Sequence, residues 1–106
     1  MTVNEKTSIT LTVTFRDENG ALVVPSAATY RLDDVGSQTA ILAATALSLA
    51  SSVNVLITST QNRILTSTNQ SESREVTVEF DYTGGLGAMH STDKYAYEVL
   101  NLYGVS

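Results

Sequence analysis

Few residues of this sequence could do chemistry, and its only histidine is the first of them. His90 stands directly before Ser91, with Asp93 close behind. A serine nucleophile activated by histidine needs a sharp supported turn and an oxyanion hole, and the sequence contains no G-x-S-x-G motif or comparable frame. We therefore expect His90 to be a solvated loop residue, and we expect no catalytic residue and no enzyme activity.

A glycine-rich segment is the second candidate. Residues 84–87 read GGLG, which superficially resembles a phosphate-binding loop. Such a loop is followed by lysine and opens a helix, and neither feature occurs here. We expect a flexible turn within a loop that spans residues 83–92.

Acidic residues offer a third candidate, because three pairs lie near predicted strand ends. Calcium takes six to eight oxygen ligands, and the converging loops of a β-sandwich can supply them. No D-x-D-x-D-G spacing is present, however, so we expect charged turns and no bound metal or other cofactor. The pairs are Asp17 and Glu18, Asp33 and Asp34, and Asp81 and Asp93.

Composition excludes several further classes. Eleven acidic and six basic residues give a net charge of -5 without any basic cluster, so we expect no binding to nucleic acid. No cysteine is present, so stability must come from packing. Residues 35–62 contain no charge and are long enough to cross a bilayer, but frequent Ser, Thr, Asn and Gln favour strands and a loop over a membrane span. The N-terminus lacks the pattern of a secretory signal.

The sequence predicts that these residues lie on or between β-strands, because apolar residues recur with period two. In residues 7–15, TSITLTVTF, four apolar side chains alternate with four hydroxyl side chains, which is typical of a half-buried strand. The same pattern predicts strands at 27–33, 38–42, 52–58 and 74–82 and a last strand from residue 94.

The connections are less regular. Asn19-Gly20 predicts a turn, since both residues tolerate positive φ. Ile64 and Leu65 are the only large apolar residues of a polar segment, and we expect them to close the end of a core where the chain crosses between sheets. Residues 40–50, AILAATALSLA, are the one helical candidate, but polar residues break the apolar stripe, and an irregular strand or short turn is favoured.

Six or seven strands in 106 residues indicate an all-β protein with a single domain, residues 1–106. The predicted fold is an antiparallel two-sheet β-sandwich of immunoglobulin-like architecture. A small β-barrel is the alternative.

Three of the five tyrosines lie in the last twelve residues. If the last strand is straight, Tyr95, Tyr97 and Tyr103 share one face and Leu100 and Leu102 share the other. Apolar groups on both faces suggest a surface that a second chain covers. A β-bulge near residue 98 or 99 would instead bring both leucines into the core. The candidate interface residues are Tyr95, Tyr97, Leu100, Leu102 and Tyr103.

The uncharged stretch 35–62 favours a partner as well, because interface cores are depleted of charge. The threonine-rich face of the first strand fits the same interpretation. Chance enrichment in Ser and Thr is the alternative explanation.

Four segments together resemble a known family. They are TVTFRDENGALVVPSAATYRL, NRIL, REVTVEFDYTGG and YAYEVLNLYGV, and with the residues between them they extend from about Thr7 to Val105. In this order they resemble the small immunoglobulin-like structural proteins and domains of tailed-bacteriophage heads, necks and tails. Related sandwiches also occur as modules of bacterial surface proteins.

The resemblance implies a non-enzymatic virion component, made in the host cytoplasm, that binds other virion proteins as a homo-oligomer or repeated subunit. Head decoration and a neck or tail accessory are the expected places. It implies no catalytic residue. The alternative function is an adhesion or carbohydrate-binding module of a bacterial surface protein, in which exposed tyrosines beside carboxylates would form the binding platform.

Overall fold

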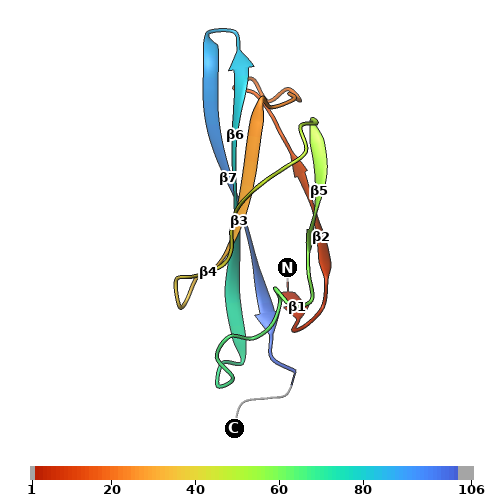
Figure 1. The fold of residues 1–106 in the computed structure, drawn as a ribbon, viewed down its shortest axis with the longest axis vertical. Coiled ribbons are helices and arrows are strands. Elements are labelled where there is room, and N and C mark those ends of the chain that lie inside the picture. The colour runs from red at the N-terminus through yellow and green to blue at the C-terminus, as the bar shows by residue number, and fades with distance from the viewer. Residues whose placement is uncertain (1, 103–106) are drawn as a thin grey trace.

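The computed structural model describes residues 2–102, and the described chain forms seven strands without a helix. Five strands form one sheet in the order β1-β7-β6-β3-β4, and β2 and β5 form a second sheet (Figure 1). The sheets face each other and do not close into a barrel. The strands are β1 (Thr2–Asn4), β2 (Ile9–Thr14), β3 (Ala27–Asp34), β4 (Thr39–Ala46), β5 (Ser52–Ile57), β6 (Ser71–Gly84) and β7 (Gly87–Leu100).

The core lies between the two sheets and follows from the alternation of the sequence. On β6 every second residue from Glu72 to Tyr82 is buried, and β2 and β5 turn Val13, Val55 and Ile57 toward it. Phe15 packs edge-on against Phe80, with ring centroids 4.9 Å apart. Burial of one face of each sheet against the other is the arrangement that period-two patterns produce.

Most predicted strands are confirmed, and pairing is antiparallel throughout except at the N-terminus. There β1, which was not predicted, pairs in parallel with β7. The helical alternative for residues 40–50 is wrong, because residues 39–46 form the edge strand β4. The pairing of β4 with β3 shifts register twice, so this strand is irregular, as predicted.

The predicted loop at 83–92 is wrong. β6 runs to Gly84 and β7 begins at Gly87, so only Gly85 and Leu86 connect them. Gly87 has a φ of +113°, which glycine adopts without strain. The glycines thus form a tight two-residue hairpin turn, and the strands continue on both sides of it.

The long β6-β7 hairpin gives the molecule its elongated shape, with principal extents of 56, 21 and 21 Å. Its tip marks one end of the molecule, at the top of Figure 1. The crossing segment between β5 and β6 lies toward the opposite end, beyond β1. Of the two residues predicted to close the core, Ile64 packs there against it, and Leu65 is half-buried.

Candidate interaction surfaces

Charge is distributed unevenly between the strands. The four strands that lie at sheet edges, β1, β2, β4 and β5, contain no charged residue. Every charged residue within a strand belongs to the central strands β3, β6 and β7. Soluble proteins commonly place charges on exposed edges to prevent pairing with other chains. The neutral edges are therefore the first candidate surface for protein association.

Of the two alternatives for the last strand, straight or bulged near residue 98 or 99, the described residues show the straight one. Pairing between β6 and β7 continues without a shift from Gly84 and Gly87 to Ser71 and Leu100. The strand is therefore straight through Leu100, with Ala96, Glu98 and Leu100 on the face away from the core.

The tyrosines of β7 face the core. Tyr97 is buried, and its hydroxyl donates to Asn62 Oδ1 at 2.7 Å. Burial raises the pKa of Tyr97 to about 12, against the opposing effect of the nearby Arg74 charge. Tyr95 is half-buried and packs against the same core. These two residues thus support the sheet, and Tyr97 has almost no surface to offer a partner.

The other predicted interface residues lie at the end of β7. Leu100 is half-buried on the outer face, and Leu102 is 61% exposed just beyond the strand. The Leu102 backbone N–H donates to Glu5 Oε1 at 3.0 Å, which ties this end to the segment after β1. Tyr103 lies outside the described residues. The interface role of Leu100, Leu102 and Tyr103 stays a prediction.

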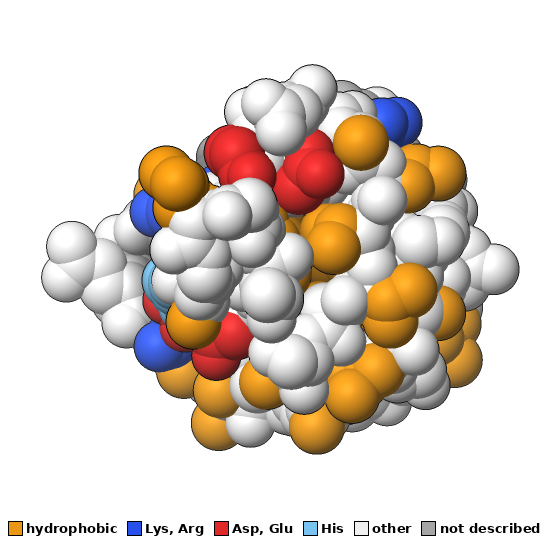
Figure 2. Space-filling view, turned by 90° about the horizontal axis from the view of Figure 1, so that it is seen from above, with side chains coloured by type: hydrophobic (Ala, Val, Ile, Leu, Met, Phe, Trp, Pro, Cys, Tyr) orange, Lys and Arg blue, Asp and Glu red, His pale blue; other side chains and the backbone are white. Residues whose placement is uncertain are grey.

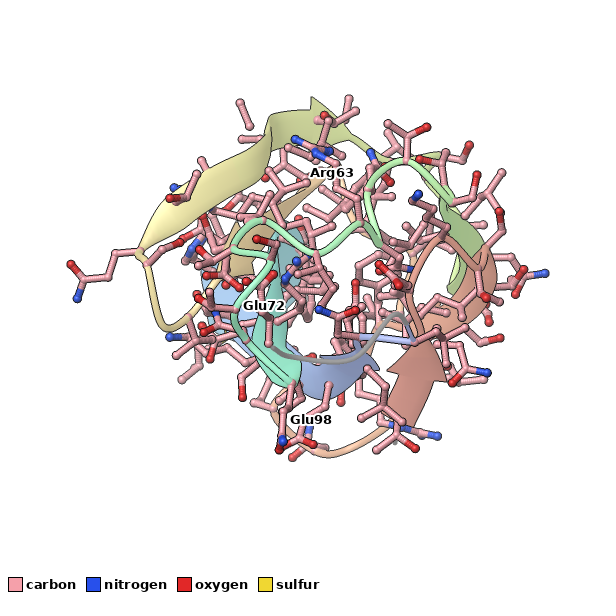
Figure 3. The ribbon with its side chains drawn as sticks, turned by 90° about the horizontal axis from the view of Figure 1, so that it is seen from below. Arg63, Glu72 and Glu98 are labelled. Atoms are coloured by element: carbon pink, nitrogen blue, oxygen red, sulfur yellow. The ribbon has the colours of Figure 1, made fainter. Side chains whose placement is uncertain are left out.

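An ion cluster that the sequence analysis did not identify fills the same end of the core. Arg74 is fully buried, with Nε 2.9 Å from Asp34 Oδ1 and Nη2 2.7 Å from Glu72 Oε1. Its guanidinium also donates to the carbonyl oxygens of Gln61 and Arg63. Figure 3 shows the segment that contains Arg63 crossing this end above Glu72, whereas Glu98 lies toward the outside. The buried charge thus anchors the crossing segment between the sheets.

Hydrogen bonds keep both buried carboxylates charged. Burial alone raises the pKa of Glu72, but donation from the Leu65 N–H, Asn69, Arg74 and the Thr66 N–H outweighs it, so the pKa is lowered. The pKa of Asp34 is lowered in the same way, because Ser37 and Arg74 outweigh the effect of burial.

The alternating pattern of β6 in the sequence could have revealed this buried cluster. Glu72 and Arg74 continue the buried alternation of Val76, Val78 and Phe80 by two further positions. A charged pair at core-facing positions indicates a buried ion pair.

The hairpin tip is the most exposed apolar point at the opposite end. Leu86 is 99% exposed. The Glu18 carboxylate accepts from the Tyr82 hydroxyl at 3.0 Å and from the Gly85 N–H at 3.4 Å. A Cβ on Gly84 would lie 2.7 Å from Glu18 Oε2, so a larger residue at this position would displace the carboxylate from its place beside the tip. Glu18 therefore holds the tip in place.

His90 is not a loop residue, contrary to the prediction. It lies on β7 opposite Asp81 of β6, and its Nδ1 is 2.6 Å from Asp81 Oδ1. Both side chains are more than half exposed on a strand surface. The pair is consistent with a cross-strand contact that stabilises the hairpin.

The other acidic residues that were considered as calcium ligands make separate contacts within the fold. Asp17 accepts from the N–H groups of Asn19 and Ala21 in the predicted turn, and Asp33 pairs with Arg31. Within residues 2–102 no three acidic or histidine side chains are grouped as a metal site requires.

Comparisons with protein-family models, with curated proteins and with solved structures found no match for the chain. Within the described residues there is no helix of the length and apolarity needed to span a membrane. The candidate sites therefore depend on the geometry alone.

Proposed function

We propose that the chain is a non-enzymatic structural protein of a tailed-phage virion. It binds other virion proteins as a head decoration, neck or tail accessory subunit. The observation that carries this proposal is the neutrality of all four edge strands in a protein of net charge -5. Neutral edges with free backbone groups suit association with other proteins and have no evident use in catalysis.

An immunoglobulin-like arrangement of the strands is part of the proposal. Its support is the order β7-β6-β3-β4 opposite β2-β5, with β1 parallel to β7. In immunoglobulin-like terms these are strands G, F, C and C′ opposite B and E, with the first strand added to G. The resemblance to phage structural proteins supplies the setting, a virion assembled from proteins made in the host cytoplasm.

We further propose that Leu100, Leu102 and Tyr103 contribute to contacts with the other virion proteins. The support is the position of the two leucines, which lie away from the core, with Leu102 largely exposed. The alternative of a carbohydrate-binding module has no comparable support, because each tyrosine within residues 2–102 is buried or half-buried. A stacking platform requires an exposed ring.

The test is the presence of the chain in purified virions, measured by immunoblot and mass spectrometry. Wild-type chain is expected in a fixed ratio to the major particle protein. Leu102→Asp is expected to lower its amount at least tenfold, whereas Leu22→Asp, which changes a similarly exposed leucine on the segment between β2 and β3, leaves it unchanged. Particles without the wild-type chain would contradict the proposed function.

A further inference from the structure

The two-stranded sheet is open on both sides, and one hydrogen bond shows which backbone groups are free. The Phe15 N–H donates to the Ser51 carbonyl at 2.9 Å, directly beyond the paired Thr14 and Ser52. Hydrogen-bonded and non-bonded pairs alternate along an antiparallel ladder. The backbone N–H and C=O groups of Ser52, Asn54 and Leu56 therefore point away from β2, along the open edge of β5.

The β5 edge differs from the other three edges. β1 has only three residues. β4 shifts register twice against β3, and bulges of this kind hinder the addition of a further strand. The β2 edge lies beside charge, because Thr14 lines a shallow depression together with Arg16, Asp17, Asp93 and Lys94. β5 pairs regularly over six residues and has no charge.

The side of the molecule that includes β5 is also the one that a second acidic copy can approach. Each copy has a net charge of -5, but the 28 residues from Val35 to Asn62, which include β4 and β5, contain no charge. Figure 2 shows hydrophobic and uncharged side chains along its lower right margin, with the acidic and basic side chains elsewhere in view. Leu56, 58% exposed on β5, adds an apolar side chain beside the edge.

We propose that β5 pairs antiparallel with β5 of a second copy about a twofold axis. The product is a continuous four-stranded sheet in the order β2-β5-β5-β2 that contains no charged residue. A twofold axis perpendicular to the sheet places residues of the outer face opposite one another, so the neutral side chains of Ser52, Asn54 and Leu56 of one copy meet the same set of side chains of the other copy. This inference rests on the proposed function and names a second copy as the partner of this edge.

A proline at position 54 tests the pairing without breaking the monomer's own ladder. Because the Asn54 N–H points outward, Asn54→Pro removes a donor to the second copy and no hydrogen bond to β2. Thr12→Pro is the matched control. Thr12 lies opposite Asn54, its N–H points to the β2 edge, and both substitutions remove the same Thr12 Oγ1 to Asn54 Oδ1 hydrogen bond of 2.9 Å.

The mass of each protein is measured by sedimentation velocity over a wide range of concentration, with circular dichroism as the check on folding. Wild type and Thr12→Pro are expected to dimerise. Asn54→Pro is expected to raise the dimer dissociation constant roughly 30-fold or more, since two hydrogen bonds are lost per dimer. A wild type that stays monomeric, or proline variants that behave alike, would overturn the pairing.

A second matched pair decides the outcome if Asn54→Pro does not fold. Leu56→Lys and Thr10→Lys place one lysine at opposing exposed positions of the same sheet. Only Leu56→Lys places a charge within the proposed contact, where charge on an edge strand opposes pairing, so it alone is expected to lose the dimer. The content of purified virions gives an independent result. A chain that is monomeric in solution but present in particles overturns the pairing and leaves the proposed function intact. A chain that dimerises but is absent from particles overturns the proposed function and leaves the pairing intact.

Discussion

The central strands and the edge strands of this protein use charge in opposite ways. β3, β6 and β7 contain all the charged residues found within strands, including the two buried ion pairs that Arg74 forms with Asp34 and Glu72. β1, β2, β4 and β5 contain none, although an exposed edge is where charge best prevents unwanted pairing. The buried charges of the central strands stabilise the fold, and we propose that the absence of charge at the edges permits association.

The largest expected effect is at Arg74. Arg74→Met is expected to lower the free energy of unfolding by about 3–5 kcal/mol, because it leaves Asp34 and Glu72 buried without their cation. Urea denaturation measures this loss. Arg31→Met, which removes the exposed bridge to Asp33, is the control and is expected to cost far less, because exposed ion pairs contribute little to stability. Equal losses for the two variants would show that the buried cluster has no special role.

Acid is expected to weaken the same cluster without a mutation. The pKa values of Asp34 and Glu72 are lowered in the folded chain from ordinary values of 3.8 and 4.5. Their contribution to stability is therefore complete above pH 4.5, and it is lost as pH falls through the ordinary values toward the lowered ones. Urea midpoints measured from pH 7 to pH 2 should fall most steeply below about pH 4. A midpoint independent of pH in this range would contradict the account.

Tyr97 and Tyr95 give a smaller contrast within one strand. Tyr97→Phe leaves the buried Asn62 oxygen without its donor, so we expect a loss of about 1–3 kcal/mol in unfolding free energy. Tyr95→Phe removes the hydroxyl of a half-buried residue and is expected to cost less than about 0.5 kcal/mol. Thermal or urea denaturation of both variants measures the difference. A larger loss for Tyr95→Phe than for Tyr97→Phe would show that the hydrogen bond from Tyr97 to Asn62 does not stabilise the fold.

The smallest expected effect concerns the edges themselves. Ala44→Lys on β4 and Leu56→Lys on β5 each add a charge at an exposed position of an edge strand. At concentrations where the protein is monomeric, each is expected to change the unfolding free energy by less than about 0.5 kcal/mol. A larger loss would mean that the monomer itself requires neutral edges, and the link between neutrality and association would fail.

Much of the fold could be predicted from the sequence, because long strands such as β2 and β6 alternate clearly between apolar and polar residues. β1 was missed, since three residues are too few to show a period. The hairpin turn was taken for a flexible loop, because the sequence alone does not show that Glu18 reaches Tyr82 and Gly85 across the fold.

The candidate surfaces were predictable only in part. The neutral stretch 35–62 is visible in the sequence, but its division between a bulged edge, β4, and a regular edge, β5, depends on pairing between distant residues. Likewise, period two placed Tyr95 and Tyr97 on one face, and only the opposite sheet determined that this face is the core.

The most direct test of the link between neutral edges and association is the mass of the wild-type protein in solution, measured by light scattering across concentration at low and high salt. Pairing of two copies through β5 predicts a rise from 11.3 kDa toward twice that mass. It also predicts tighter association in high salt, because salt screens the repulsion between two copies of charge -5 and an uncharged contact loses nothing. A mass that stays at 11.3 kDa at every concentration and salt would contradict the account.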